Sequence, residues 1–83
     1  MKEITLKQLH ELFTQYFINK LGWSKDDEAI ECLFEAQEPD DIYVALYYIA
    51  EVIGRRKGWG EEGIGDLQLK FINDLDIDDI EII

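Results

Sequence analysis

The chain has 83 residues, of which 19 are Asp or Glu and 8 are Lys or Arg, so its formal net charge at pH 7 is −11. Hydrophobic residues make up 47% and aromatic residues 12%, a composition too apolar for a disordered acidic tail, and it predicts a folded chain. So short a chain predicts one acidic domain over residues 1–83, without a cleft between domains. Its negative charge disfavours direct binding to nucleic acid or anionic membranes, because these are also negatively charged.

The first expected helix spans about residues 5–21. Its apolar residues recur at spacings of three and four, which is the spacing of one helix face. They are Leu9, Leu12, Phe13, Tyr16, Phe17 and Leu21. Thr5 followed by Gln8 has the form of a capping box, and Gly22 suits the left-handed conformation in which many helices end. Both ends of this helix are therefore indicated.

A second, acidic helix is expected next, with Ser24 and Asp27 as its start signal. Its apolar face holds Ile30, Leu33 and Phe34, and the opposite face holds Asp27, Glu28, Glu31, Glu35 and Glu38. Cys32 lies next to the apolar face, so we expect a buried thiol that packs as a small apolar residue.

The glutamates of this segment form a stripe, because they follow one another at spacings of three or four. They are Glu28, Glu31, Glu35 and Glu38. Like charges at this spacing weaken an isolated helix by roughly a few tenths of a kcal/mol per pair, which points to a role other than helix stability. The alternative interpretation is a surface that only keeps the protein soluble.

A third helix is expected to begin at Pro39, whose missing N–H group costs nothing in the first turn, and Asp40 and Asp41 complement the positive end of its dipole. Over residues 42–53 the apolar residues occupy most sides of a helix, which is typical of a central element of the core. A buried strand is the alternative, but the run is longer than a typical strand. Three cations suit the last turn, and Gly58 can end the helix.

The C-terminal part begins with glycines, which predict one flexible connection over residues 58–65 with Trp59 as its anchor. Asp66 is expected to cap a fourth helix over about residues 67–75. Residues 76–83 form either a final helical turn or an extended segment. The expected fold is therefore all-α, a compact bundle of about four helices with room for a short fifth element at the C-terminus.

Few residues of this chain are suited to chemistry. One cysteine and one histidine, Cys32 and His10, cannot form an internal disulfide or supply the roughly four ligands of a structural zinc site. Aspartates at 74, 76 and 78 have the spacing of the first ligands of a calcium-binding loop, but the glycine and the final glutamate of such a loop are missing. We therefore expect no catalytic residues, no metal and no cofactor, and a protein that is not an enzyme.

The location and the partner can also be approached from the sequence. No stretch approaches the roughly 18 to 20 apolar residues of a membrane span, and the start lacks the pattern of a signal peptide, so we expect a cytoplasmic protein. Residues 26–41 carry eight Asp and Glu and no Lys or Arg. This block predicts a docking surface for a basic protein partner. Whether copies of the chain associate is left open.

The residues expected to bind the partner combine carboxylates with aromatic side chains that can act as anchors. The carboxylates are Asp27, Glu28, Glu31, Glu35, Asp40 and Asp41, and the aromatic anchors are Tyr43, Tyr47 and Trp59.

The first half of the chain resembles a known family. The run Leu12-Phe13-Thr14-Gln15-Tyr16-Phe17, then Gly22-Trp23, an acidic helix and an apolar helix, is similar to the opening of small helical immunity proteins of contact-dependent growth inhibition systems. The resemblance covers roughly residues 9–53. It implies a cytoplasmic antitoxin that neutralises a cognate toxin by binding it, with the acidic surface covering a basic nuclease site. It carries over no active-site residues.

Two other functions remain open at this point. A phage-encoded inhibitor that mimics nucleic acid, and so blocks a host defence nuclease, needs the same acidic surface. An acyl carrier or adaptor domain is also short, acidic and helical, but a carrier needs an exposed serine at a helix start, usually within Asp-Ser-Leu. The single serine here is Ser24, within Trp-Ser-Lys, which disfavours the carrier.

Overall fold

The structure is a computed structural model that describes residues 2–83. In chain order its elements are β1 (Lys2–Ile4), α1 (Leu6–Phe13), the π-helix η1 (Thr14–Lys20), α2 (Glu28–Glu35), α3 (Pro39–Lys57), α4 (Glu61–Leu75), the 3-10 helix η2 (Ile77–Asp79) and β2 (Ile80–Ile82). Helices account for 73% of the described residues, which confirms the expected mainly helical bundle. None of these helices is both long and apolar enough to cross a bilayer.

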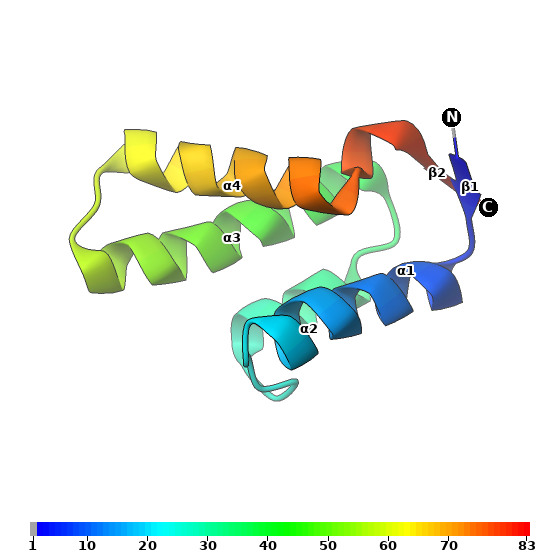
Figure 1. Ribbon diagram of the computed structural model, residues 1–83, viewed down its shortest axis with the longest axis horizontal. Coiled ribbons are helices and arrows are strands. Elements are labelled where there is room, and N and C mark those ends of the chain that lie inside the picture. The colour runs from blue at the N-terminus through cyan, green and yellow to red at the C-terminus, as the bar shows by residue number, and fades with distance from the viewer. Residues whose placement is uncertain (1) are drawn as a thin grey trace.

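The helices form two layers (Figure 1). The long helices α3 and α4 lie side by side and run in opposite directions, and α1 with its continuation η1 lies beside α2 below them. The core lies between the layers, where the largest fully buried side chains meet. They are Leu9, Phe13, Phe17, Ile30, Leu33, Ile42, Leu46, Ile49 and Phe71.

The first helix begins as expected but changes its geometry halfway. The Thr5 side chain accepts a hydrogen bond from the Gln8 backbone N–H (3.1 Å), and the Gln8 side chain accepts one from the Thr5 backbone N–H (3.0 Å), which confirms the capping box. From Thr14 onward the chain is a π-helix. A π turn holds more residues than an α turn, so the helix face rotates along η1. As a result the prediction for Leu21 is wrong: its side chain is 43% exposed.

The wider turn of η1 directs two consecutive aromatic residues toward α4. Tyr16 and Phe17 both make edge-to-face contacts with Phe71, with ring centroids 5.9 and 5.2 Å apart. The segment then ends near Gly22, which has the expected positive φ of 78°. These contacts join the first helical segment to α4.

The second helix is shorter than expected. Its N-cap is Asp27, whose carboxylate accepts a hydrogen bond from the Ala29 N–H (3.0 Å), whereas Ser24 accepts one from Asp26 (3.2 Å) in the preceding turn and is not part of the cap. The helix ends at Glu35, so Glu38 is not part of the stripe and instead precedes α3 as its N-cap.

The orientation of α2 also corrects the expectation for Cys32. The buried residues of α2 are Ala29, Ile30 and Leu33. This places the centre of the core face near residues 29 and 33, rather than near Phe34 as expected, and Cys32 falls outside it. The thiol is exposed.

The third helix confirms the helical prediction over the strand. It runs from Pro39 in its first turn to Lys57 in its last, and Gly58 ends it in the left-handed conformation (φ 73°). The Trp59 N–H donates to the Gly54 carbonyl (2.8 Å), as is typical of a glycine-terminated helix.

The prediction of a flexible connection over residues 58–65 is wrong, because α4 covers most of this segment. The helix already begins at Glu61, with Gly60 and not Asp66 at its N-cap. Glutamates at 61 and 62 favour this early start because they lie at the positive end of the helix dipole. The Trp59 side chain covers Gly63, where an added Cβ would lie 3.3 Å from the Trp59 Cβ. The true connection is therefore only three residues long, and Gly63 and Gly65 are helical.

The tail contains both of the expected alternatives. After Asp76, which has a φ of 54°, the chain forms η2 and then the strand β2. This strand pairs in parallel with β1, in the register Lys2↔Ile80, Glu3↔Glu81 and Ile4↔Ile82. The sheet was not expected, because strands of three residues are too short to show a period in the sequence.

Candidate functional site

The predicted carboxylates do not form one face. Glu28, Glu31 and Glu35 are all exposed on α2, but Glu31 and Glu35 line a groove toward η1, whereas Glu28 lies on the side of α3. Asp40 and Asp41 are exposed at the start of α3. The acidic surface is therefore divided among several sides of the molecule, and of these predicted carboxylates Glu31 and Glu35 share the groove toward η1.

The groove between η1 and α2 has a volume of about 650 Å³. Its lining residues are Thr14 and Ile18 of η1, Glu31, Phe34 and Glu35 of α2, and Lys25 and Asp26 of the connection between them. Ile18 and Phe34 are half-buried and supply apolar surface. The charged residues around them carry three carboxylates and one ammonium group. An apolar groove with a negative surround suits a cationic, amphipathic ligand.

Packing on both sides holds the walls of this groove. The Phe34 ring makes an edge-to-face contact with Phe13 (centroids 5.9 Å apart) and lies 5.2 Å from the His10 ring. The Thr14 hydroxyl donates a hydrogen bond to the His10 carbonyl (2.9 Å) at the junction of α1 and η1. The groove is therefore built on side chains that belong to the core or adjoin it.

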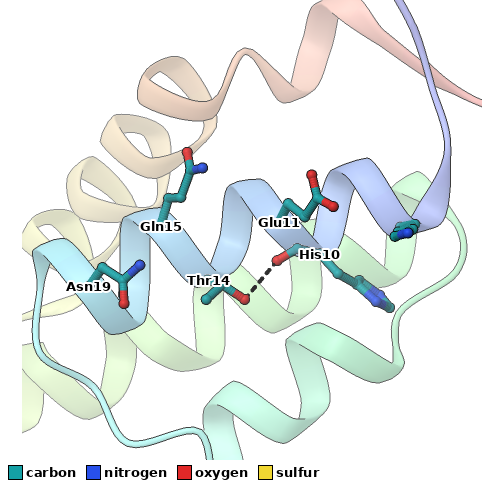
Figure 2. A pocket seen from close by; sticks show the side chains of 6 residues that line it. His10, Glu11, Thr14, Gln15 and Asn19 are labelled. Carbon is teal, nitrogen blue, oxygen red and sulfur yellow. Dashed lines mark hydrogen bonds between the residues drawn. The ribbon is translucent and has the colours of Figure 1, made fainter.

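A second hollow of about 670 Å³ follows the outer face of α1 and η1 and shares Thr14 with the groove. Its lining residues are Lys7, His10, Glu11, Thr14, Gln15 and Asn19. Figure 2 shows the His10 ring turned toward α2 and Glu11 turned away from it. His10 Nε2 is buried and has no hydrogen-bond partner among the described residues. These two side chains therefore do not form an acid–base pair, and the His10 ring serves to pack against Phe34.

Tyr48 is the tyrosine that lies beside the acidic surface, although Tyr43 and Tyr47 were expected there. The nearby Glu28 carboxylate raises the pKa of Tyr48 above its ordinary value, and burial, Asp27 and Glu51 act in the same direction. Tyr48 and Glu51 are not among the residues predicted to bind the partner. Their spacing of three on α3 was a signal, but the proximity of Glu28 depends on how α2 packs against α3.

Tyr43 has a different neighbourhood. Its hydroxyl donates a hydrogen bond to Asp78 of η2, and this bond, together with burial, raises the pKa of Tyr43. The Gln68 side chain donates to the Tyr43 carbonyl (2.9 Å). Tyr43 thus connects α3 with α4 and with the C-terminal segment.

The other two expected anchors also lie outside the groove. Tyr47 is half-buried on α3 and packs against the core. Trp59 is 40% exposed, its ring lies 5.3 Å from Lys57 Nζ, and it lines a shallow hollow with α4.

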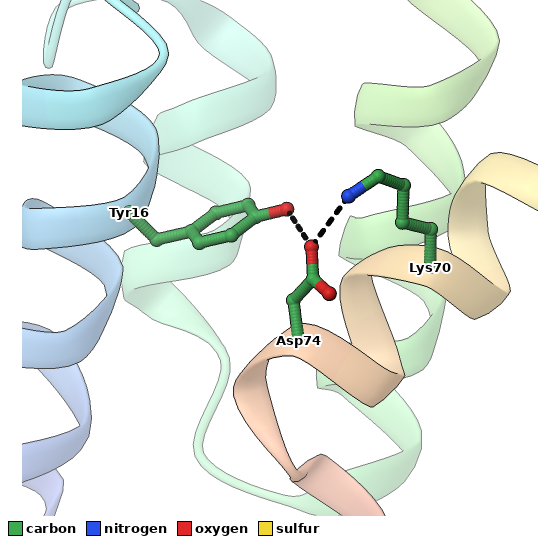
Figure 3. Close-up of polar contacts among 3 residues, drawn as sticks. All are labelled: Tyr16, Lys70 and Asp74. Atoms are coloured by element: carbon green, nitrogen blue, oxygen red, sulfur yellow. Dashed lines mark hydrogen bonds and ion pairs between the residues drawn. The ribbon is translucent and has the colours of Figure 1, made fainter.

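A polar cluster joins η1 to α4 (Figure 3). The Tyr16 hydroxyl and Lys70 Nζ both donate to Oδ2 of Asp74, at 2.6 and 2.7 Å. Lys20 Nζ lies 5.3 Å from the centre of the Tyr16 ring. Burial and the Asp74 carboxylate raise the pKa of Tyr16 well above its ordinary value. A phenol held in its protonated form cannot act as a base at neutral pH, so this cluster is a structural link.

The pH dependence of this link gives a first prediction. The hydrogen bonds from Lys70 and Tyr16 lower the pKa of Asp74 in the folded chain. The link therefore contributes stability above the unfolded pKa, about 3.9, and loses it as the pH falls through the folded value. We expect Asp74→Asn to lower the melting temperature at pH 7 and to have little effect near pH 2, as measured by circular dichroism. Asp66→Asn, an equal charge change on the same helix, is the control, and equal effects of both variants at every pH would contradict the role of the link.

Neither a metal-binding group among the described residues nor a related protein identifies the site. Within residues 2–83, no group of three His, Cys, Asp or Glu side chains is placed to hold a metal ion. Comparison of the chain with protein-family models, curated proteins and solved structures gave no match. The groove between η1 and α2 and the charges around it are therefore the features that bear on function.

Proposed function

We propose that the protein binds a basic protein partner and inhibits it, in the manner of an immunity protein that masks the basic site of a nuclease-type toxin. The observation that carries the proposal is the excess of exposed carboxylates on and around α2. Residues 26–41 hold eight Asp and Glu and no cation. Three of these side chains, Glu28, Glu31 and Glu35, are exposed along α2.

The α2 carboxylates are not used inside the molecule. Among the described residues, the ion pairs within 4 Å are Arg55 with Glu51 (3.4 Å) and Lys70 with Asp74 (2.7 Å), and both lie outside α2. Glu28 and Glu31 lie in the first turn, where the helix dipole favours carboxylates, but the like-charge pair Glu31 and Glu35 weakens the helix. A basic partner would neutralise this pair. A surface of this kind can raise the rate of association with such a partner by roughly 10- to 1,000-fold.

The density of charge on α2 favours a protein-masking role over close imitation of DNA. Glu31 and Glu35, which share one side of α2, lie about 6 Å apart along the helix axis at the usual rise of 1.5 Å per residue, whereas one DNA strand carries about one phosphate per 3.4 Å of its axis. The phage-encoded nucleic-acid mimic is therefore the weaker form of the proposal. The carrier alternative loses support because Ser24 lies in a turn ahead of α2 rather than at its start.

The experiment that tests the proposal is affinity capture from the native host lysate at low salt, followed by elution in a salt gradient and mass spectrometry. We expect one basic protein in stoichiometric amount, released as salt screens the charges, and we expect the protein to inhibit its activity. The double reversal Glu31→Lys with Glu35→Lys should slow association at least about tenfold while leaving the melting temperature nearly unchanged.

The control for this experiment is Asp66→Lys with Asp79→Lys, which makes the same change in net charge at exposed positions on α4 and η2. This control should retain most of the binding. Equal affinity of the wild type and the α2 double reversal would refute the proposed surface, as would failure of the folded protein to retain any basic protein.

A further inference from the structure

We infer that the groove between η1 and α2 receives an amphipathic, basic helix of the partner, with one large apolar side chain seated against Ile18 and Phe34. The inference rests on the proposed function, because it needs a basic protein partner. It goes further by specifying which part of the partner makes the contact and what that part must look like.

The shape of the groove argues for a helical occupant. One wall carries Thr14 and Ile18, four residues apart on η1, and the other carries Glu31 and Glu35, four residues apart on α2. The groove therefore runs along both helices, and Lys25 and Asp26 line it from the connection that joins them. A groove between two neighbouring helices is the usual seat of a third helix, which contacts it with residues one turn apart.

The chemistry of the groove selects an amphipathic helix rather than a merely charged one. Ile18 and Phe34 are half-buried, so part of their apolar surface faces the groove and remains in contact with water. A Leu, Ile, Phe or Met side chain seated there would remove apolar surface from water on both partners, a gain of about tenfold to hundredfold in affinity. A helix with only polar side chains would forgo this gain.

The carboxylates around the groove indicate where the partner helix would carry its cationic side chains. Glu31 and Glu35 stand one turn apart on one side, so an Arg or Lys pair one turn apart on the partner helix can meet both. The lining holds one cation, Lys25, and three carboxylates, so the groove remains negative.

Two exposed apolar side chains on the other helices lack this combination. Val44 on α3 and Leu69 on α4 are 69% and 53% exposed. Neither of them lines the groove or the other two hollows described above. They serve as controls for the role of Ile18.

The test uses two synthetic peptides of 14 residues and equal charge. One is an amphipathic Leu/Lys helix, and in the other each Leu is replaced by Ser. Fluorescence anisotropy at low salt should show at least tenfold tighter binding of the Leu/Lys peptide. Ile18→Ser should remove most of this difference, whereas Leu69→Ser should leave it intact. Glu31→Gln with Glu35→Gln should weaken the binding of both peptides.

The outcomes separate this inference from the proposed function. Equal binding of both peptides, with strong salt dependence, would refute the apolar contact with Ile18 and Phe34 but would still support the acidic docking surface. Binding of neither peptide would overturn both. Because Ile18→Ser can also unfold the protein, methyl NMR of the wild type provides a second measurement: the Leu/Lys peptide should shift the Ile18 signal, and shifts confined to Val44 and Leu69 would overturn the assignment.

Discussion

Alanine in place of Phe17 is expected to lower the free energy of unfolding by about 3–5 kcal/mol. The Phe17 side chain is fully buried, and its ring packs edge to face with Tyr16 (4.9 Å between centroids) and with Phe71 (5.2 Å). Removing the ring leaves a cavity between η1 and α4. A chain of this length has a total stability of only about 4–12 kcal/mol, so the variant should approach the limit of folding.

Urea unfolding followed by circular dichroism would measure this loss. Phe17→Leu should cost much less than the alanine variant, because it keeps most of the side-chain volume. Leu69→Ala, at an exposed position on α4, should change stability by less than about 0.5 kcal/mol. A cost of less than about 1 kcal/mol for Phe17→Ala would mean that η1 does not pack against α4 as described.

Alanine at Gly54 is expected to destabilise the protein by about 1–2 kcal/mol, even though alanine is the better helix former. A Cβ at this position would lie 2.5 Å from Cγ1 of Ile64 and 3.2 Å from its Cδ1. Overpacking of this kind costs about 1–3 kcal/mol, against a gain of at most about 1 kcal/mol in helix propensity. The glycine therefore allows α3 and α4 to approach closely near their connection.

The matched control is Gly65→Ala, since Gly65 also lies inside a helix but an added Cβ there meets nothing within 4 Å. This change should stabilise the protein by about 0.5–1 kcal/mol, so the two glycines should respond with opposite signs. In an Ile64→Ala background, Gly54→Ala should lose most of its cost, and a double-mutant cycle by urea unfolding would measure the coupling. Additive effects would contradict the steric explanation.

The elements with strong local signals were predictable from the sequence. The capping box at Thr5, the start of α3 at Pro39 and its end at Gly58 were all expected and are all observed. Each of these depends on residues within a few positions of one another along the chain. The central position of α3 followed from apolar residues on most of its sides, and Ile42, Leu46 and Ile49 are indeed fully buried.

The sequence does not predict the local structure where packing between distant segments decides it. The π-helix keeps Tyr16 and Phe17 against Phe71, which lies more than fifty residues later, and it thereby exposes Leu21. Glycine usually marks a loop, yet Gly63 is helical under the Trp59 side chain.

In the candidate site too, the features that depend on one helix were predictable and those that depend on packing between helices were not. The exposure of Glu31 and Glu35 was expected from the spacing of charges on α2. The groove beside them was not, because its apolar surface combines Ile18 of η1 with Phe34 of α2. The apolar pattern of α2 predicts Phe34 in the core, and Ile18 lines this groove from within a π-helix. No spacing within a single element brings these two side chains together.

The parallel pairing of β1 with β2 has a consequence for the order of folding. It connects residues 2–4 with residues 80–82, so this ladder closes a loop of about 80 residues, and the two strands lie side by side in Figure 1. The entropy lost in closing a flexible loop of this length is about 4 kcal/mol, which a ladder of three residue pairs cannot offset alone. The ladder therefore forms only after the helices have packed and brought its strands together, and we expect it to open when the bundle loosens.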